Sequence, residues 1–167
     1  MKTTSLAALT AALALVLTSV AIAHPGAPHA ASSPSALPAE AQAAALTVDA
    51  FHAALGRGDA PAAAALLDDK ASIFEEGEAE QSKAAYVGGH LPADIAYLKD
   101  VRDVIVDRTG SAADGLAWIA TQGRAQGRYH DRAVDRETTE TMVLRRTPQG
   151  WRIVHIHWSS HAAKAPD

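Results

Sequence analysis

The stretch GWRIVHIHWSS, residues 150–160, lies near the end of the chain and decides the predicted fold. Bulky apolar side chains alternate with polar ones in it, and the turn-like Pro148-Gln149 precedes it. The segment before the turn, ETTETMVLRRT (137–147), has the same period of two. Because successive side chains of a strand point to opposite faces, the two segments predict an antiparallel hairpin.

The rest of the chain divides into helix-like and strand-like segments. Strands are predicted over 70–77, 101–109 and 116–129, and helices over 39–55, from Asp59 onward and over 82–100, the last with a break at Gly88-Gly89 and Pro92. Helices that precede an antiparallel meander indicate an α+β domain. We therefore expect the N-terminal helices to pack on one face of a curved antiparallel sheet.

The alternation in the final hairpin assigns its side chains to two faces. Five of them make the more apolar face and are predicted to lie in the core: Met142, Leu144, Val154, Ile156 and Trp158. The opposite face of the last strand carries Trp151, Ile153, His155 and His157, which are predicted to point away from the core. These four side chains would face solvent or another subunit.

The N-terminal segment predicts export. Residues 1–23 have a basic start, an apolar run and a small-residue Ala21-Ile22-Ala23 end, which is typical of a secretory signal peptide. We predict a flexible tether over 24–38, the folded domain over 39–161 and a C-terminal tail over 162–167. The mature chain would be periplasmic or secreted, with no membrane segment.

Composition excludes several classes of function. The formal net charge is −4, which does not favour binding to nucleic acid. The chain has no cysteine, so thiol catalysis and thiolate metal sites are excluded. It also lacks a phosphate-binding Gly-rich loop, a G-x-S-x-G elbow and an H-E-x-x-H motif. We predict no cofactor.

Two segments resemble the nuclear transport factor 2-like (NTF2-like) superfamily. They are VDAFHAALGRGDAPAAAALLDDKASIF (48–74) and ETTETMVLRRTPQGWRIVHIHWSS (137–160). The chain looks most like SnoaL-like proteins and the association (hub) domain of calmodulin-dependent protein kinase. The resemblance implies a cone-shaped domain over about 39–161 and a homodimer that pairs through the outer face of the sheet. It leaves function open, because this fold hosts isomerases, cyclases, dehydratases and non-enzymatic assembly domains.

The resemblance also predicts a ligand pocket in the cone. Arginines line the hub pocket at positions that match Ala120, Met142 and Trp158, none of which is basic in this chain. A pocket without an arginine cluster is unsuited to a carboxylate and favours a small neutral or apolar ligand. Glu75 and Ile156 complete the predicted lining.

Catalytic candidates come from the same elements. Tyr86 and His90 are four residues apart and can share one face of a helix, with Asp94 four residues further on. A histidine near a carboxylate can act as a general base, and a glutamate buried in the cone, Glu75 or Glu140, would have a raised pKa. Two alternatives stay open: His90 could satisfy backbone groups at the helix break, and Glu140 could pair with an arginine across the sheet.

Histidines outside this group have alternative roles. His155 and His157 project together and offer two good ligands, so a metal site is a secondary alternative to sheet or interface residues. His24 would be the first residue of the mature chain and could chelate copper. His52 has no partner in sequence and receives no role.

Two classes of function follow. One is a binding or assembly domain with a small apolar pocket. The other is an enzyme of the SnoaL or ketosteroid-isomerase type, which moves a proton on a small hydrophobic substrate with His90 or a buried glutamate as base and Tyr86 as donor. The sequence favours the first class slightly, because no catalytic pair in it forms a recognised motif.

Overall fold

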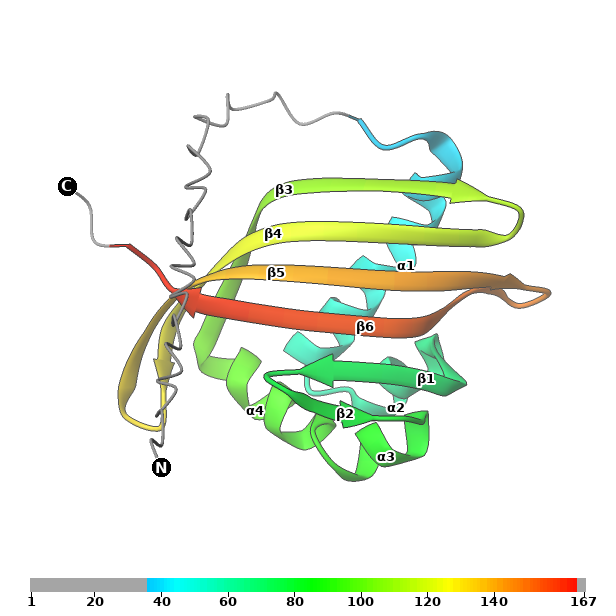
Figure 1. Ribbon diagram of the computed structural model, residues 1–167. Coiled ribbons are helices and arrows are strands. Elements are labelled where there is room, and N and C mark those ends of the chain that lie inside the picture. Colours follow the sequence, from blue (N-terminus) through cyan, green and yellow to red (C-terminus); the bar gives the residue numbers. More distant parts are fainter. Residues whose placement is uncertain (1–35, 165–167) are drawn as a thin grey trace, which may run out of the picture. The chain divides into compact units, whose positions relative to one another are not determined.

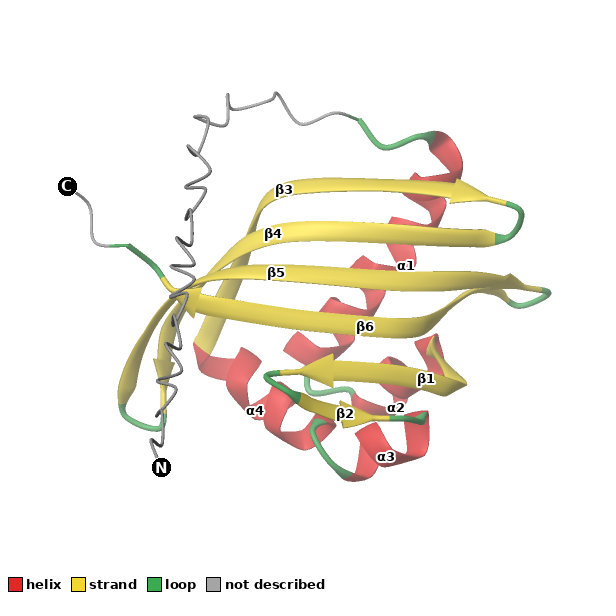
Figure 2. Ribbon diagram, in the orientation of Figure 1, coloured by secondary structure: helices red, strands yellow, loops and turns green. Residues whose placement is uncertain are grey.

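The computed structural model describes residues 36–164. The predicted signal peptide, most of the predicted tether, including His24, and residues 165–167 lie outside the described residues. In chain order the elements of the described part are α1 (Ala39–Gly56), α2 (Ala60–Leu66), β1 (Leu67–Glu75), β2 (Glu78–Glu80), α3 (Lys83–Gly88), α4 (Leu91–Asp100), β3 (Val101–Ala113), β4 (Leu116–Tyr129), β5 (Arg132–Thr147) and β6 (Gly150–Ala162) (Figures 1 and 2).

The predicted α+β architecture is confirmed, with one correction to the sheet. The strand order is β2-β1-β6-β5-β4-β3, and β1 pairs with β6 in parallel while every other pair is antiparallel. The sheet is therefore mixed rather than antiparallel throughout. Alternation within a strand indicates its two faces but not its partner, so the sequence could not reveal this pairing. The short strand β2 was not predicted.

The helices lie on one face of the curved sheet, as predicted. Helix α1 crosses that face, α2 and α3 lie beside β1, and α4 lies between α1 and the start of β3 (Figure 1). Local signals position the short helices: the Asp59 carboxylate accepts a hydrogen bond from the Ala62 backbone N–H at 3.1 Å, and the Ser82 hydroxyl accepts one from Ala85 at 3.1 Å. The predicted break at Gly88-Gly89 separates α3 from α4.

A β-bulge corrects the predicted faces of β6. Val143 lies opposite His155, but Leu144 lies opposite Ile153, so Val154 is an extra residue on β6. The bulge reverses the alternation, and Ile153 and Trp151 join the core face instead of the outer face. The outward prediction for those two residues was therefore wrong.

The core lies between α1 and the sheet. Helix α1 contributes a buried stripe that includes Val48, Phe51 and Leu55. These side chains pack against strand residues that are fully buried: Ile73, Ile119, Met142, Leu144, Ile153 and Ile156. Burial of apolar surface at roughly 25 cal/mol per Å² is the main term that holds the two layers together. Within residues 36–164, no helix is long and apolar enough to span a bilayer.

Candidate functional site

A row of five side chains crosses the helix-facing side of the sheet. The strand register aligns one residue from each of five neighbouring strands: Glu75 on β1, Trp158 on β6, Glu140 on β5, Thr121 on β4 and Arg108 on β3. The row continues to α1 through an ion pair of 2.7 Å between Arg108 Nη1 and the Asp49 carboxylate. Arg108 Nε also donates to the Thr121 hydroxyl at 3.2 Å.

Glu140 is the buried centre of the row. Its carboxylate is 9% exposed, and its Oε2 atom accepts from Trp158 Nε1 at 2.7 Å and lies 2.7 Å from His52 Nε2 on α1. Burial alone would raise the pKa of Glu140, but its hydrogen bond to His52 and the charge of His52 outweigh burial and lower it. Burial alone would lower the pKa of His52, but the hydrogen bond to Glu140 outweighs burial and raises that pKa. Glu140 is therefore held as a carboxylate.

The pKa of Glu75, on the other side of Trp158, shifts in the opposite direction. Burial is the main cause that raises its pKa, and the negative charge of Asp94 adds to it, so that the pKa of Glu75 reaches about 7. A carboxyl group with this pKa exists in both protonation states near neutral pH. The two glutamates that flank one tryptophan therefore differ in protonation.

A second polar group borders the row from α3 and α4. The Tyr86 hydroxyl donates to Asp94 Oδ2 at 2.6 Å, and burial raises the pKa of both groups. His90 Nδ1 forms a close contact with Glu80 Oε1, and this hydrogen bond raises the pKa of His90. The negative charge of Glu75 also raises the pKa of Tyr86, which places the two groups in one electrostatic environment.

Three aromatic rings connect the two polar groups. Phe51 on α1 stacks on Trp158 with ring centroids 6.4 Å apart, and Tyr86 lies 6.5 Å from Phe51 and 6.4 Å from Trp158. Such contacts exclude water from the base of the site and fix the orientation of Trp158. The arrangement places the carboxyl groups of Glu75, Glu140 and Asp94, the Tyr86 phenol and the His52 imidazole around an apolar surface.

Comparison with known proteins identifies the family. The model of the SnoaL-like domain matches residues 45–163. The chain belongs to the SnoaL-like family. A similar solved structure is a candidate ketosteroid isomerase from Shewanella frigidimarina, with 34% identity and a TM-score of 0.70 over 74% of this chain and 100% of that chain. No curated protein matches the chain.

More distant structures of similar fold support the predicted superfamily. A candidate dehydratase of the NTF2-like family from Streptomyces avermitilis has 19% identity and a TM-score of 0.65, over 74% of this chain and 97% of that chain. A candidate calcium/calmodulin dependent protein kinase II association domain from Xanthomonas campestris has 23% identity and a TM-score of 0.62, over 78% of this chain and 95% of that chain. At these identities the likeness concerns the fold alone, and it confirms the NTF2-like prediction.

The site of this SnoaL-like protein gathers most of the residues predicted for it. Glu75, Trp158 and Glu140 are consecutive in the row, and Tyr86 contacts Trp158. His90 lies at the start of α4, where its partner is Glu80. The open question about Glu140 is answered by its bonds to His52 and Trp158, because neither is an arginine.

Three predicted pocket residues lie elsewhere. Met142 and Ile156 are fully buried in the core, where they pack against other side chains. Ala120 lies opposite Thr141, next to the buried Ile119, so its side chain is on the outer face of the sheet and not inside the predicted cone. The alternation of β4 sets this orientation, whereas the alignment with the hub domain placed Ala120 inside the cone.

Sequence reasoning missed His52. Its partner Glu140 follows 88 residues later, so no local pattern links the two. A signal was present: His52 is four residues after the buried Val48, which places it on the apolar side of α1. A polar side chain on that side needs a buried partner.

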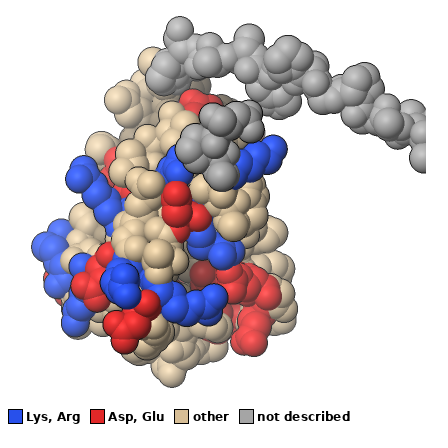
Figure 3. Space-filling view, turned by 90° about the vertical axis from the view of Figure 1, so that its left-hand side faces the viewer, with Lys and Arg blue, Asp and Glu red and all other residues tan. Residues whose placement is uncertain are grey.

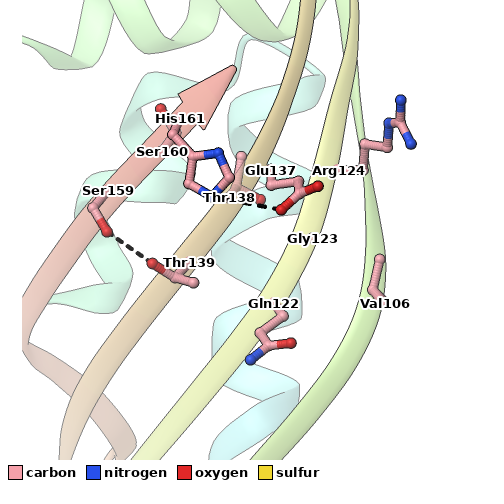
Figure 4. A pocket seen from close by; sticks show the side chains of 10 residues that line it. All are labelled: Val106, Gln122, Gly123, Arg124, Glu137, Thr138, Thr139, Ser159, Ser160 and His161. Carbon is pink, nitrogen blue, oxygen red and sulfur yellow. Dashed lines mark hydrogen bonds and ion pairs between the residues drawn. The ribbon is translucent and has the colours of Figure 1, made fainter. Parts of the chain in front are cut away.

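Two shallow hollows of the described part lie on the outer face of the sheet. The larger, of about 480 Å³, spans β3 to β6 and is lined by polar side chains that include Gln122, Thr139 and Ser159 (Figure 4). The sequence predicted a cavity on the other face, under the helices. Phe51, Tyr86 and Trp158 occupy that space.

The surface where the strands bend carries charges of both signs. Acidic and basic side chains are interspersed there (Figure 3). Arg124, for example, forms a two-pronged pair with Asp135, with both bonds 2.7 Å long. Such a surface does not concentrate charge of one sign, which a polyanion-binding site requires.

Proposed function

We propose that this SnoaL-like protein is an enzyme that transfers a proton on a small neutral or apolar substrate, which binds beside Glu75 at the partly exposed end of the row. One observation carries the proposal: Glu75 and Glu140 lie on either side of Trp158, and their pKa values shift in opposite directions. Carboxyl groups whose environments separate their pKa values can divide the roles of proton carrier and fixed charge at one pH.

Glu75 is the proposed proton carrier. As a carboxylate it accepts a proton from a carbon beside a carbonyl group, while the electron pair of that C–H bond moves toward the carbonyl oxygen. Return of the proton to another carbon completes an isomerisation and regenerates the carboxylate. Asp94, which accepts a hydrogen bond from Tyr86 and whose pKa is raised by burial, donates to the oxygen in its protonated form. Glu140 stays ionised, and its bonds to His52 and Trp158 position Trp158 against the substrate.

The comparisons support this class of reaction. The Shewanella frigidimarina protein, at 34% identity, is a candidate ketosteroid isomerase. Closely packed aromatic rings at the base of the site favour an apolar substrate.

The proposal is tested by deuterium exchange at the carbon beside a carbonyl, followed by NMR. The panel contains small ketones and an unsaturated ketosteroid. We expect exchange with the wild type and a loss of at least 100-fold in Glu75→Gln. The matched control is Glu137→Gln, which changes a half-exposed glutamate on β5 that is not in the row. Absence of exchange with every compound, or full activity in Glu75→Gln, would contradict the proposal.

A second candidate is a binding or assembly domain without chemistry, the class that the sequence slightly favours. The observation behind it is the filled interior, where Phe51, Tyr86 and Trp158 pack against one another. A thermal-shift screen distinguishes the candidates. A compound that raises the Tm but exchanges no proton would favour binding alone.

We also propose a homodimer that pairs through the outer face of the sheet. Two aromatic side chains are exposed on this face, Trp118 on β4 at 43% and Phe74 on β1 at 41%. Exposed apolar surface of this kind marks interaction sites. The candidate association domain from Xanthomonas campestris adds support from the same fold. Light scattering should give twice the chain mass for the wild type and the chain mass for Trp118→Glu.

Export remains part of the proposal. The pattern over residues 1–23 supports cleavage after Ala23. Expression of the full chain in a bacterial host, followed by N-terminal sequencing of the periplasmic fraction, should give a chain that begins at His24. An uncleaved chain in the cytosol would contradict export.

A further inference from the structure

The outer face of the sheet holds a pair of histidines that the proposed enzymatic function does not use. His155 and His157 are on β6, and their ring centroids are 6.4 Å apart. In the strand order, β6 has two strands on one side and three on the other, so the pair lies near the middle of the sheet. Both point away from the core.

Neighbouring side chains hold the His155 ring in an orientation suited to a metal ligand. Its Nδ1 atom is hydrogen-bonded to the Ser72 hydroxyl at 2.9 Å, which leaves Nε2 free. Metal-binding histidines typically use their second nitrogen in this way, because the bond fixes the ring and its tautomer. The edge of Phe74 contacts the same ring, at 5.2 Å between centroids and an angle of 90°.

His157 is exposed and makes no side-chain hydrogen bond within residues 36–164. Phe74 also contacts its ring, with centroids 6.4 Å apart. The cross-strand neighbours of the two histidines are Ser72, Phe74, Thr141 and Val143, all uncharged. None of these four neighbours is a cation that would repel a metal ion or a carboxylate that would compete for the imidazoles.

One chain cannot complete a tetrahedral site at this position. Within the described residues, no three histidine, aspartate or glutamate side chains are grouped so that they could hold a metal ion. Zinc in structural sites takes four protein ligands. In a twofold-symmetric dimer the same surface meets itself, so residues near the axis face their own copies. Pairing through the middle of the outer face would bring together four histidines.

We propose that His155 and His157 are the ligands that each chain contributes to a four-histidine zinc site shared by two copies of this chain. The inference rests on the proposed pairing of the outer faces and is independent of the proposed proton transfer. Imidazole nitrogen is a preferred ligand of Zn²⁺, and four imidazoles satisfy its tetrahedral geometry. The site would join the dimer at the centre of its interface.

The test is a calorimetric titration of the full chain with zinc chloride, with the mass measured in parallel by light scattering, with and without EDTA. We expect half a zinc ion per chain and the mass of a dimer. His157→Asn, which removes an exposed ring without a described hydrogen bond, should weaken binding at least tenfold and keep the wild-type Tm in EDTA. Ser72→Ala should weaken it about tenfold through loss of ring orientation.

The matched control is His161→Ala, which removes another exposed histidine of β6 and should leave zinc binding unchanged. A dimer that binds no zinc would overturn the metal site and leave the pairing intact. One zinc per chain on a monomer would overturn the shared site and the pairing together. Binding that survives His157→Asn would place the zinc at other residues and overturn the inference.

Discussion

His52 on α1 and Glu140 on β5 are 88 residues apart in the chain, and a hydrogen bond of 2.7 Å joins their side chains. The bond connects the longest helix to the sheet at the centre of the row that contains Glu75 and Trp158. Burial favours neutral groups at this position, so the ionised pair persists only because each partner stabilises the charge of the other.

Removal of His52 should destabilise the fold. His52→Ala leaves the buried Glu140 carboxylate with Trp158 as its remaining donor, and a buried charge with too few partners is costly. Because His52 is 36% exposed and solvent screens its charge, we expect a loss of about 2 kcal/mol in the free energy of unfolding, below the roughly 3–5 kcal/mol of fully buried pairs. Urea denaturation measures this loss. The control is His161→Ala, at a histidine that is 66% exposed, which should change the free energy of unfolding by less than about 0.5 kcal/mol.

The loss in His52→Ala should depend on pH. The pKa of His52 is raised in the folded state, so its stabilisation is complete below the unfolded value of 6.5 and is lost as the pH rises through the folded value. We therefore expect a larger difference between wild type and variant at pH 6 than at pH 9. Equal differences at the two pH values would show that protonated His52 does not contribute.

Glu75 should make the protein less stable as the pH rises from 4.5 to 7. Its pKa is about 7 in the folded state against 4.5, so the unfolded chain loses this proton first and gains relative stability. The expected decrease is roughly 1–2 kcal/mol, after allowance for partial exposure. Glu75→Gln should abolish it in urea denaturation measured at several pH values. A decrease of the same size in the variant would contradict the raised pKa.

Gly123 on β4 should not tolerate a side chain. A Cβ atom there would lie 2.7 Å from Asp103 Oδ1 and 2.7 Å from Thr138 Oγ1, two atoms on the helix-facing side near the row. We expect Gly123→Ala to reduce the free energy of unfolding by about 1–3 kcal/mol through this overlap. Gly88→Ala in α3 is the control, because no atom lies within 4 Å of a Cβ at that position. Thermal unfolding compares the two variants, and equal Tm values would contradict the close approach.

Trp158 should contribute more to stability than Trp118. Trp158→Phe removes the hydrogen bond to Glu140 and leaves a buried carboxylate oxygen without that donor, at a cost of about 2 kcal/mol. Trp118→Phe changes a side chain that is 43% exposed on the outer face and should cost less than about 0.5 kcal/mol in the monomer. Urea denaturation at low protein concentration makes the comparison, and a smaller effect at Trp158 would refute the role assigned to it.

The order of helices and strands could be predicted because local patterns encode it. Asp59 and Ser82 cap their helices, Gly88-Gly89 interrupts the third helical segment, and period-two alternation marks the long strands. The bulge at Val154 could not be foreseen, because it arises from the pairing of β6 with β5. The parallel pairing of β1 with β6 likewise depends on tertiary packing.

The site was predictable only in part, for the same reason. Glu75, Glu140 and Trp158 were candidates because they are polar or aromatic residues on the predicted cavity strands, and the register makes them neighbours. Burial and the charge of Asp94 raise the pKa of Glu75, whereas His52 lowers the pKa of Glu140, and Asp94 and His52 come from two helices. No spacing within one element could reveal either contact.

The most direct test of the account is a carbon-13 NMR titration of the protein labelled at its glutamate carboxyl groups, with Glu75→Gln and Glu140→Gln to assign the two resonances. We predict that Glu75 titrates near pH 7 and that Glu140 titrates below the usual range of glutamate. Titration of both residues between pH 4 and 5, near the ordinary value for glutamate, would contradict the central claim that one tryptophan separates a proton carrier from a fixed charge.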